Sequence, residues 1–160
     1  MTPRSTARRR GGTVREREAR YGVAGVPVVV DASMAAVWFT NEPDRRGAMQ
    51  LLEATSILLA PDLMAVEATN AWWKRLRRRE MDIAELERAL THLLGLQIMW
   101  IAATTLLRPA ARLAAELGHP IDDCVYLALA TSHGALLATA DERLRQGAQH
   151  IGVRLWSSRT

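Results

Sequence analysis

The chain has 160 residues, 49% of them hydrophobic, which suits one soluble globular domain with a core of its own. No apolar run approaches the roughly 18 residues that a membrane-spanning helix needs. The single cysteine, Cys124, excludes an intramolecular disulfide and a cysteine-based zinc site, and the four histidines include no i, i+4 pair that would favour a histidine metal site. We therefore expect a cytoplasmic protein with no membrane partner.

The net charge of +4 is concentrated at the amino terminus. Residues 1–20 hold seven of the 21 basic residues and two of the 17 acidic ones, which leaves 14 basic and 15 acidic groups for the rest of the chain. This segment has no apolar stretch of the kind found in a secretory signal and almost nothing to bury. We expect residues 1–22 to be a disordered arginine-rich tail, either dispensable or able to hold nucleic acid by charge, and residues 23–160 to form one domain.

Short apolar runs alternate with helical patterns along this domain. A short apolar run between turn signals is typical of a strand in a buried parallel sheet, whereas apolar residues three and four apart predict a helix. Ser, Thr or Asp marks the start of a helix and Gly its end. On these signals the first half contains a strand at Val28–Val30, a helix from a Ser33 cap to about Thr40, a helix from an Asp44 cap to about Ala54, a strand at Ile57–Ala60 and a helix from Asp62 to about Arg79.

The second half continues the alternation. It opens with a helix whose first residues, Asp82 and Glu85, have the spacing of a capping box. Strands that alternate with helices predict an α/β fold, in which a parallel β-sheet is flanked by helices on both faces as an α/β/α sandwich. The remaining expected elements are a strand at Gln97–Ala102, a helix capped by Thr104 or Thr105 and ended by Gly118, a buried helix capped by Asp122 or Asp123 and ended by Gly134, a strand at Ala135–Ala138, a helix at Glu142–Ala148 and a strand at Val153–Trp156.

Carboxylates fall where the expected strands end. Asp31 follows the first strand and Asp141 follows a later one, so both are expected at the carboxyl edge of the sheet, where open α/β sheets bind ligands. The doublet 122–123 opens the helix that leads into that later strand. Glu67 stands among apolar neighbours in the third helix, with Asn70 three residues beyond it. The sequence therefore predicts an acidic cluster at one edge of the sheet.

Each of these acids also has a purely structural interpretation, as a helix cap or a solvated side chain. Together they favour a site, because carboxylates that converge without a lysine or arginine partner repel one another unless a divalent cation neutralises them. Oxygen ligands suit Mg²⁺ or Mn²⁺, and such ions serve displacement at phosphorus. The basic run Lys74–Arg79, interrupted by Leu76, closes the helix that carries Glu67. It either complements the helix dipole or binds the phosphates of a nucleic acid.

Four stretches, VVVDAS, PDLMAVEATNA, HPIDDCVYLALA and LLATADERL, resemble in their order and spacing the PIN-domain family, specifically its toxin ribonucleases of the VapC type. The resemblance runs from Val28 to Trp156. It implies a PIN-like fold and hydrolysis of RNA with Mg²⁺ or Mn²⁺. Carried over position by position, it names as metal-binding and catalytic residues Asp31, Glu67, Asp123 and Asp141, with Ser33, Asn70 and Thr139 as supporting residues.

The doublet needs a choice of register. The family often has a non-acidic residue where this chain has Asp122, and Asp123 is favoured because the following Tyr126 and Leu127 then match the family pattern. Asp122 is retained as a supporting residue.

The resemblance further implies a homodimer and a cognate antitoxin whose C-terminal segment covers the acidic groove. Apolar residues of the third and fourth helices are expected to serve these contacts, namely Trp72, Trp73, Leu90, Leu93 and Leu94. Three functions stay open: a metal-dependent endoribonuclease that is the toxin of a toxin–antitoxin pair, a PIN-type nuclease of RNA processing or of DNA, and a catalytically idle protein-binding module. The intact set of four acids argues against the idle module. A phosphotransferase of the haloacid-dehalogenase type is disfavoured because Ser33 stands where it would need a second aspartate.

Overall fold

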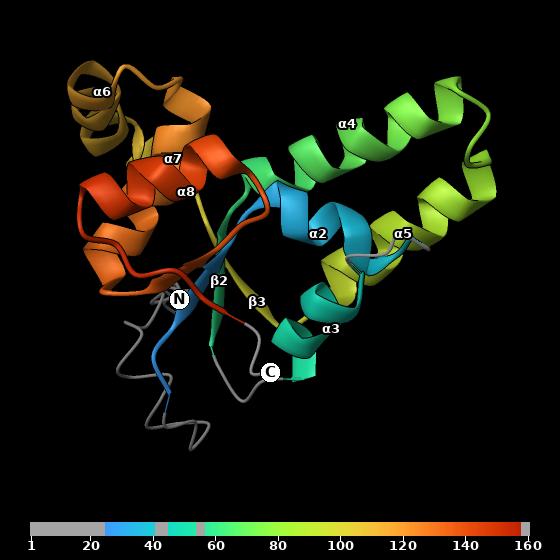
Figure 1. Cartoon of the computed structure of the whole chain (residues 1–160). Coiled ribbons are helices and arrows are strands. Elements are labelled where there is room, and N and C mark those ends of the chain that lie inside the picture. Colours follow the sequence, from blue (N-terminus) through green and yellow to red (C-terminus); the bar gives the residue numbers. More distant parts are fainter. Residues whose placement is uncertain (1–24, 41–44, 54–56, 158–160) are drawn as a thin grey trace, which may run out of the picture.

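The computed structural model describes residues 25–40, 45–53 and 57–157 (Figure 1). The expected tail at 1–22 and the expected helix cap Asp44 lie outside these ranges. Within them, none of the helices combines the length and the apolar character needed to cross a membrane.

A parallel sheet lies at the centre of the fold. Its strands are β1 (Val28–Val30), β2 (Leu58–Pro61), β3 (Ile98–Ile101) and β4 (Leu136–Ala138), in the order β3-β2-β1-β4. The chain builds outward from β1 to β3 and then returns to the other side of β1. The boundary between β1 and β4 is therefore the topological switch point, where an open sheet of this kind leaves a crevice at its carboxyl edge.

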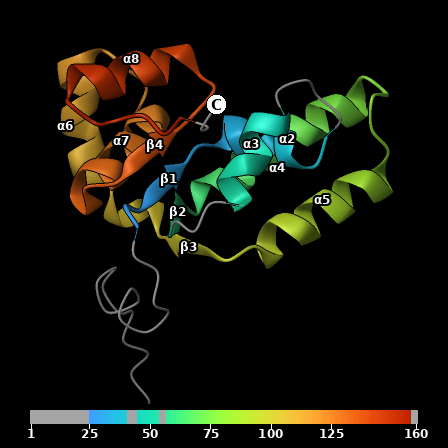
Figure 2. The ribbon, with the colours of Figure 1, turned by 60° about the horizontal axis from the view of Figure 1, so that its bottom comes forward.

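Helices cover the sheet, and those late in the chain gather on one side of it. In Figure 1, α6, α7 and α8 lie together, while α2, α3, α4 and α5 lie on the opposite side, with the α4–α5 pair extending away from the sheet in Figure 2. The expected α/β fold, a parallel sheet flanked by helices, is confirmed. The helix bounds are α2 Ala32–Trp38, α3 Arg45–Glu53, α4 Leu63–Arg77, α5 Ile83–Gly95, the 3₁₀ turn η1 Ala103–Thr105, α6 Leu107–Leu117, α7 Ile121–His133 and α8 Glu142–His150.

The buried core is built around α7 and two tryptophans. Every residue of α7 from Cys124 to Ala130 is buried, as its apolar composition predicts. Trp38 and Trp72 are fully buried, and each donates its indole hydrogen to a backbone oxygen, of Ala48 at 2.8 Å and of Ala36 at 3.0 Å. The second of these bonds ties α4 to α2, so the helix that carries Glu67 is fixed against the end of β1.

Two of the apolar residues expected to face partners are core residues instead. Trp72 and Leu93 have no exposed surface, and Leu90 is partly buried against the core. Trp72 is bonded to α2 and Leu93 belongs to the buried core, which sequence periodicity alone does not reveal. Trp73 and Leu94 remain exposed, at 44% and 57%.

Three expected helix starts are wrong. Asp31, rather than Ser33, is the N-cap of α2, because its carboxylate accepts from the Ser33 amide while the strand end keeps Asp31 extended. Pro120 is the N-cap of α7, so the acidic doublet lies within the first turn instead of before it. The predicted threonine cap of α6 is replaced by the turn η1, after which Leu106 precedes the helix.

Other helix boundaries that the sequence predicts are confirmed. Asp82 and Glu85 form the expected capping box, and Gly118 and Gly134 end their helices in the left-handed conformation, at φ 66° and 57°. The strand expected at Val153–Trp156 is reduced to one parallel bridge, between Leu155 and Leu137.

Candidate active site

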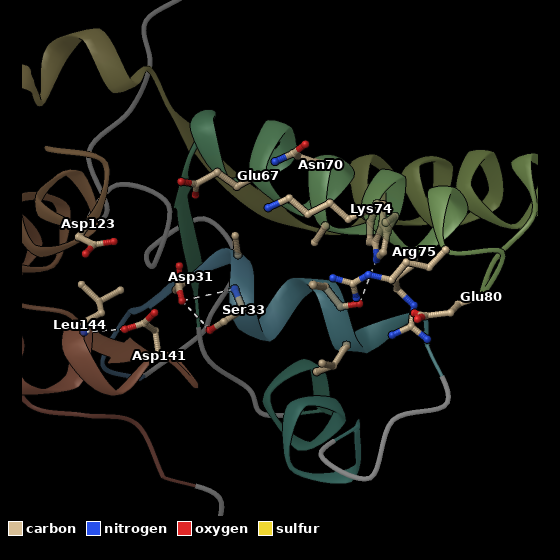
Figure 3. A pocket seen from close by; sticks show the side chains of 16 residues that line it. Asp31, Ser33, Glu67, Asn70, Lys74, Arg75, Glu80, Asp123, Asp141 and Leu144 are labelled. Carbon is tan, nitrogen blue, oxygen red and sulfur yellow. Dashed lines mark hydrogen bonds between the residues drawn. The ribbon is translucent and has the colours of Figure 1, made fainter. Parts of the chain in front are cut away.

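A cavity of about 580 Å³ opens at the carboxyl edge of the sheet (Figure 3). Five acids line it in the described part of the chain: Glu80, and four others that come from four different elements. Asp31 comes from the end of β1, Glu67 from α4, Asp123 from the first turn of α7 and Asp141 from the N-cap of α8. The structure therefore brings together the acids that the sequence separates by up to 110 residues.

Asp31 is held by hydroxyl groups on both sides. Asp31 is buried, with 6% of the residue exposed, and its Oδ2 accepts from Ser33 Oγ at 2.6 Å and from Thr139 Oγ1 at 2.7 Å. The Asp31 amide also donates to Ala138 O at 3.0 Å, which joins the ends of β1 and β4. These contacts fix one buried carboxylate oxygen in place, as a preorganised site requires.

Thr139 extends this network to the next acid. Its Oγ1 accepts from the Asp141 amide at 2.9 Å, and Ser33 Oγ accepts from the Ala140 amide at the same distance. Asp141 itself caps α8, because its Oδ1 accepts from the Leu144 amide at 2.9 Å. Asp141 is thus both the cap that the sequence left open and a lining residue of the cavity.

Glu67 turns toward the cavity and accepts a short hydrogen bond from the hydroxyl of Tyr126. Burial raises the pKa of Glu67, the Tyr126 hydrogen bond opposes this, and the charges of Asp31, Asp122 and Asp123 raise the pKa further. Burial and the neighbouring Glu67 charge also raise the pKa of Tyr126, so it remains a hydrogen-bond donor at physiological pH.

Asp123 has a cationic partner, contrary to the expectation of acids without one. Arg143 Nη2 of α8 lies 2.8 Å from Asp123 Oδ2. Burial raises the pKa of Asp123, Arg143 lowers it, and the charges of Asp122, Asp141 and Asp31 raise it. Asp122 is exposed and is not among the lining residues, so of the doublet only Asp123 reaches the cavity in the described part of the chain.

A sequence profile described as PIN domain matches residues 28–149, most of the chain. The chain belongs to the PIN domain family. Proteins of this family are generally nucleases, which supports a nuclease role. A comparison with curated protein sequences found no match.

Solved structures share the fold of this PIN domain. PAE2754 from Pyrobaculum aerophilum has a TM-score of 0.61 and 27% identity, over 76% of this chain and 79% of its own. VapC20 of Mycobacterium tuberculosis, a sarcin-ricin-loop-cleaving toxin, has a TM-score of 0.61 at 14% identity, over 82% of this chain and 99% of its own. The second likeness concerns the fold alone.

The donor set of the PIN domain cavity fits a hard divalent cation. Carboxylate oxygens are the ligands that Mg²⁺ and Mn²⁺ prefer. Asp123 Oδ2 is buried, and its contact with Arg143 is an ion pair without the geometry of a hydrogen bond. Among the residues that the structure describes, no three His, Cys, Asp or Glu side chains converge as a ready-made ligand set. Mutual repulsion keeps carboxylates apart, and Asp123 is drawn toward Arg143.

The far end of the same cavity is basic. Lys74, Arg75 and Arg78 line it along α4, beyond Asn70, and Lys74 is seven residues or about 10 Å along the helix from Glu67. The exposed Asn70 lines the cavity without a hydrogen bond from the other described residues. The cavity therefore presents four acids at one end and, at the other, cations together with the carboxylate of Glu80 (Figure 3).

Sequence reasoning missed two residues of this site. Tyr126 served only to choose the register of α7, although a hydroxyl in an otherwise apolar buried helix is a signal that it needs a partner. Arg143 gave no comparable signal, because arginines in exposed helices are common. Only the position of α8 beside the first turn of α7 brings it to Asp123.

Proposed function

We propose that this PIN domain is a metal-dependent endoribonuclease that hydrolyses RNA phosphodiester bonds. The observation that carries the proposal is the joint lining of one cavity by Asp31, Glu67, Asp123 and Asp141. Repulsion among these carboxylates destabilises a protein that uses them only as a scaffold, whereas the same negative charges attract a divalent ion. A catalytically idle binding module would gain nothing from it.

The four acids would hold Mg²⁺ or Mn²⁺. When bound, such an ion lowers the pKa of water and stabilises the leaving oxygen in phosphodiester hydrolysis. Ser33 and Thr139 keep Asp31 Oδ2 in place, Tyr126 orients Glu67, and the cap hydrogen bond to the Leu144 amide orients Asp141. Asp31, Glu67 and Asp141 would thus be held by their own hydrogen bonds, whereas Asp123 is held by Arg143, and Asn70 and Asp122 would modulate the site from its margin.

The basic end of the cavity would hold the RNA strand. Lys74 and Arg78 make no ion pair with other described residues, and both face the same cavity as the acids. Phosphates flanking the scissile bond would contact them while the scissile phosphate lies at the acids. This division of charge favours a nucleic-acid strand over a small phosphate ester, which would leave the basic end unused.

A toxin role is the most economical biological setting for this activity. The similarity to VapC20, a toxin, supports it, as does the resemblance of the motifs to VapC-type ribonucleases. A cognate antitoxin would insert an arginine or lysine among the acids, a counter-charge that this cavity accepts well. The exposed Trp73 and Leu94 of the α4–α5 pair offer apolar contacts for that antitoxin or for a homodimer partner.

The second candidate function keeps the nuclease chemistry and changes its setting to DNA or to RNA processing. The same acids and cations would serve it.

We infer that residues 23–160 carry the activity as one cytoplasmic domain. The arginine-rich residues 1–22 would add at most nonspecific affinity for nucleic acid.

Substrate and genetic context separate these functions. The purified protein is incubated with matched single-stranded RNA and DNA oligonucleotides in Mn²⁺, and the product of any short gene immediately upstream is added in a second series. Cleavage of RNA alone, abolished by the added protein, is the expected result. Cleavage of DNA, or cleavage unaffected by an adjacent gene product, would support the second candidate, and cleavage of neither would overturn the nuclease proposal.

A further inference from the structure

Arg143 reaches from the first turn of α8 to an acid of the cavity. Its Nη2 lies 2.8 Å from Asp123 Oδ2, and the two side chains are 56% and 18% exposed. The other acids have different contacts: hydroxyls for Asp31, a phenol for Glu67 and a backbone amide for Asp141. Within the described part of the chain, Asp123 is thus the acid of this cluster that is paired with a cation.

The charges around Asp123 show what this pairing does. Asp122, Asp141 and Asp31 all disfavour its ionised form, and Arg143 is the charge that opposes them. A divalent ion placed among the acids would also favour the ionised form of Asp123, from the cavity side. It would also meet the guanidinium as a competitor for Oδ2 and as a like charge close by.

The side chain of Arg143 can move away from Asp123 into solvent. Its side chain is more than half exposed, and a long arginine side chain at the rim of a cavity can move into water without losing core contacts. Its neighbour Arg145 differs in an instructive way, because it pairs with the exposed Glu142 at 3.5 Å and not with a cavity acid. Comparing substitutions of Arg143 and Arg145 therefore separates the effect of the contact with Asp123 from the effect of removing one positive charge from α8.

We propose that Arg143 is an internal counter-ion that competes with the metal for Asp123, holding this carboxylate in the metal-free protein and yielding it when the metal binds. The inference rests on the metal site of the proposed function. It makes Arg143 a residue that sets metal affinity rather than a metal ligand. By linkage, the metal must weaken the Arg143–Asp123 pair to the same extent that the pair weakens metal binding.

The test is a calorimetric titration of Mn²⁺ into the full-length, metal-free protein, with wild type, Arg143→Gln and Arg145→Gln compared. Arg143→Gln is expected to tighten Mn²⁺ binding by about two- to fivefold, because an ion pair that is partly exposed to solvent contributes only a small free energy. Arg145→Gln removes the same charge from the same helix and is expected to change the affinity by less. In Asp123→Asn, adding Arg143→Gln is expected to leave the remaining affinity unchanged.

Thermal unfolding supplies a second readout. Arg143→Gln is expected to lower the melting temperature of the metal-free protein more than that of the Mn²⁺-saturated protein, because the ion replaces the lost counter-charge. Weaker or unchanged Mn²⁺ binding in Arg143→Gln, or an equal loss of stability with and without Mn²⁺, would overturn the proposal and leave Arg143 as a structural partner of Asp123. Failure of the metal-dependent function itself would appear earlier, as a wild-type protein that takes up no Mn²⁺.

Discussion

Thr139 donates its hydroxyl hydrogen to Asp31 Oδ2 across 2.7 Å and so joins the ends of β4 and β1 at the floor of the cavity. The contact spans the switch point of the sheet and is buried. It makes the position of the first acid depend on a residue 108 positions away in the sequence.

Loss of this hydroxyl is expected to cost both stability and activity. Thr139→Val keeps the shape of the side chain but leaves Asp31 Oδ2 and the Asp141 amide each short of a partner, which should lower the free energy of unfolding by about 1–3 kcal/mol. Thr139→Ser retains the hydroxyl and is the matched control. Urea unfolding and RNA cleavage rates measure the two effects, and a Thr139→Val protein as stable and active as Thr139→Ser would refute this role.

The Tyr126–Glu67 hydrogen bond should appear in the pH dependence of activity. Because the bond lowers the pKa of Glu67 against the effect of burial, its removal in Tyr126→Phe raises that pKa further. The acid limb of the rate profile should then move to higher pH, with the rate recovering once Glu67 ionises. Cleavage rates measured across pH at saturating Mn²⁺ check this, and a limb that stays in place or moves to lower pH would count against it.

Metal-free stability should depend on pH in the direction set by the raised pKa of Glu67. The folded protein holds this proton more tightly than the unfolded chain, so its contribution is present below the unfolded value of 4.5 and is lost as pH rises through the folded pKa. In EDTA, Glu67→Gln should therefore melt higher than wild type at neutral pH and about the same at acid pH. A neutral-pH melt in which Glu67→Gln is the less stable protein would reverse the sign of this argument.

The acidic doublet gives a sharp test of register. Asp123 lines the cavity and Asp122 does not, so Asp123→Asn should abolish cleavage whereas Asp122→Asn should retain most of it. Neither residue caps α7, so Asp122→Asn should lose the favourable interaction of a first-turn acid with the helix dipole, about 0.3–1 kcal/mol, and the relief of its repulsion with Glu67 and Asp123 opposes this loss. Both variants are assayed on the same RNA, with thermal melts alongside. An inactive Asp122→Asn with an active Asp123→Asn would shift the register by one residue.

Patterns of apolar residues predict the four strands of the sheet and the helices around it, and Asp31, Asp141 and the acidic doublet follow from their places at strand and helix ends. Glu67 stands out by its apolar neighbours, and the choice of Asp123 within the doublet comes from the resemblance to the family. The choice between neighbouring residues that could each cap the same helix is harder to predict. Both Asp31 and Ser33 can cap a helix, and the choice depends on the extended backbone at the end of β1. The strand expected at the end of the chain is reduced to the bridge between Leu155 and Leu137, which its apolar pattern does not predict.

The contacts that the sequence did not predict are those between side chains of different elements. Arg143 meets Asp123, and Tyr126 meets Glu67 across 59 residues, only after α7, α8 and α4 have packed around the sheet. Local periodicity carries no information on such pairs. The burial of Trp72, which the sequence left as a candidate partner contact, has the same origin.

The central claim, that these acids perform metal-dependent hydrolysis of RNA, is tested most directly by one cleavage assay. Wild type, Asp31→Asn and Asp62→Asn are compared in Mn²⁺ and in EDTA. Asp62 is the matched control, since it follows β2 as Asp31 follows β1 but accepts from the Ala103 amide outside the cavity, a role that asparagine can keep. We predict Mn²⁺-dependent cleavage by wild type and Asp62→Asn and a loss of at least about 100-fold in Asp31→Asn. Undiminished cleavage by Asp31→Asn, or by wild type in EDTA, would contradict the claim.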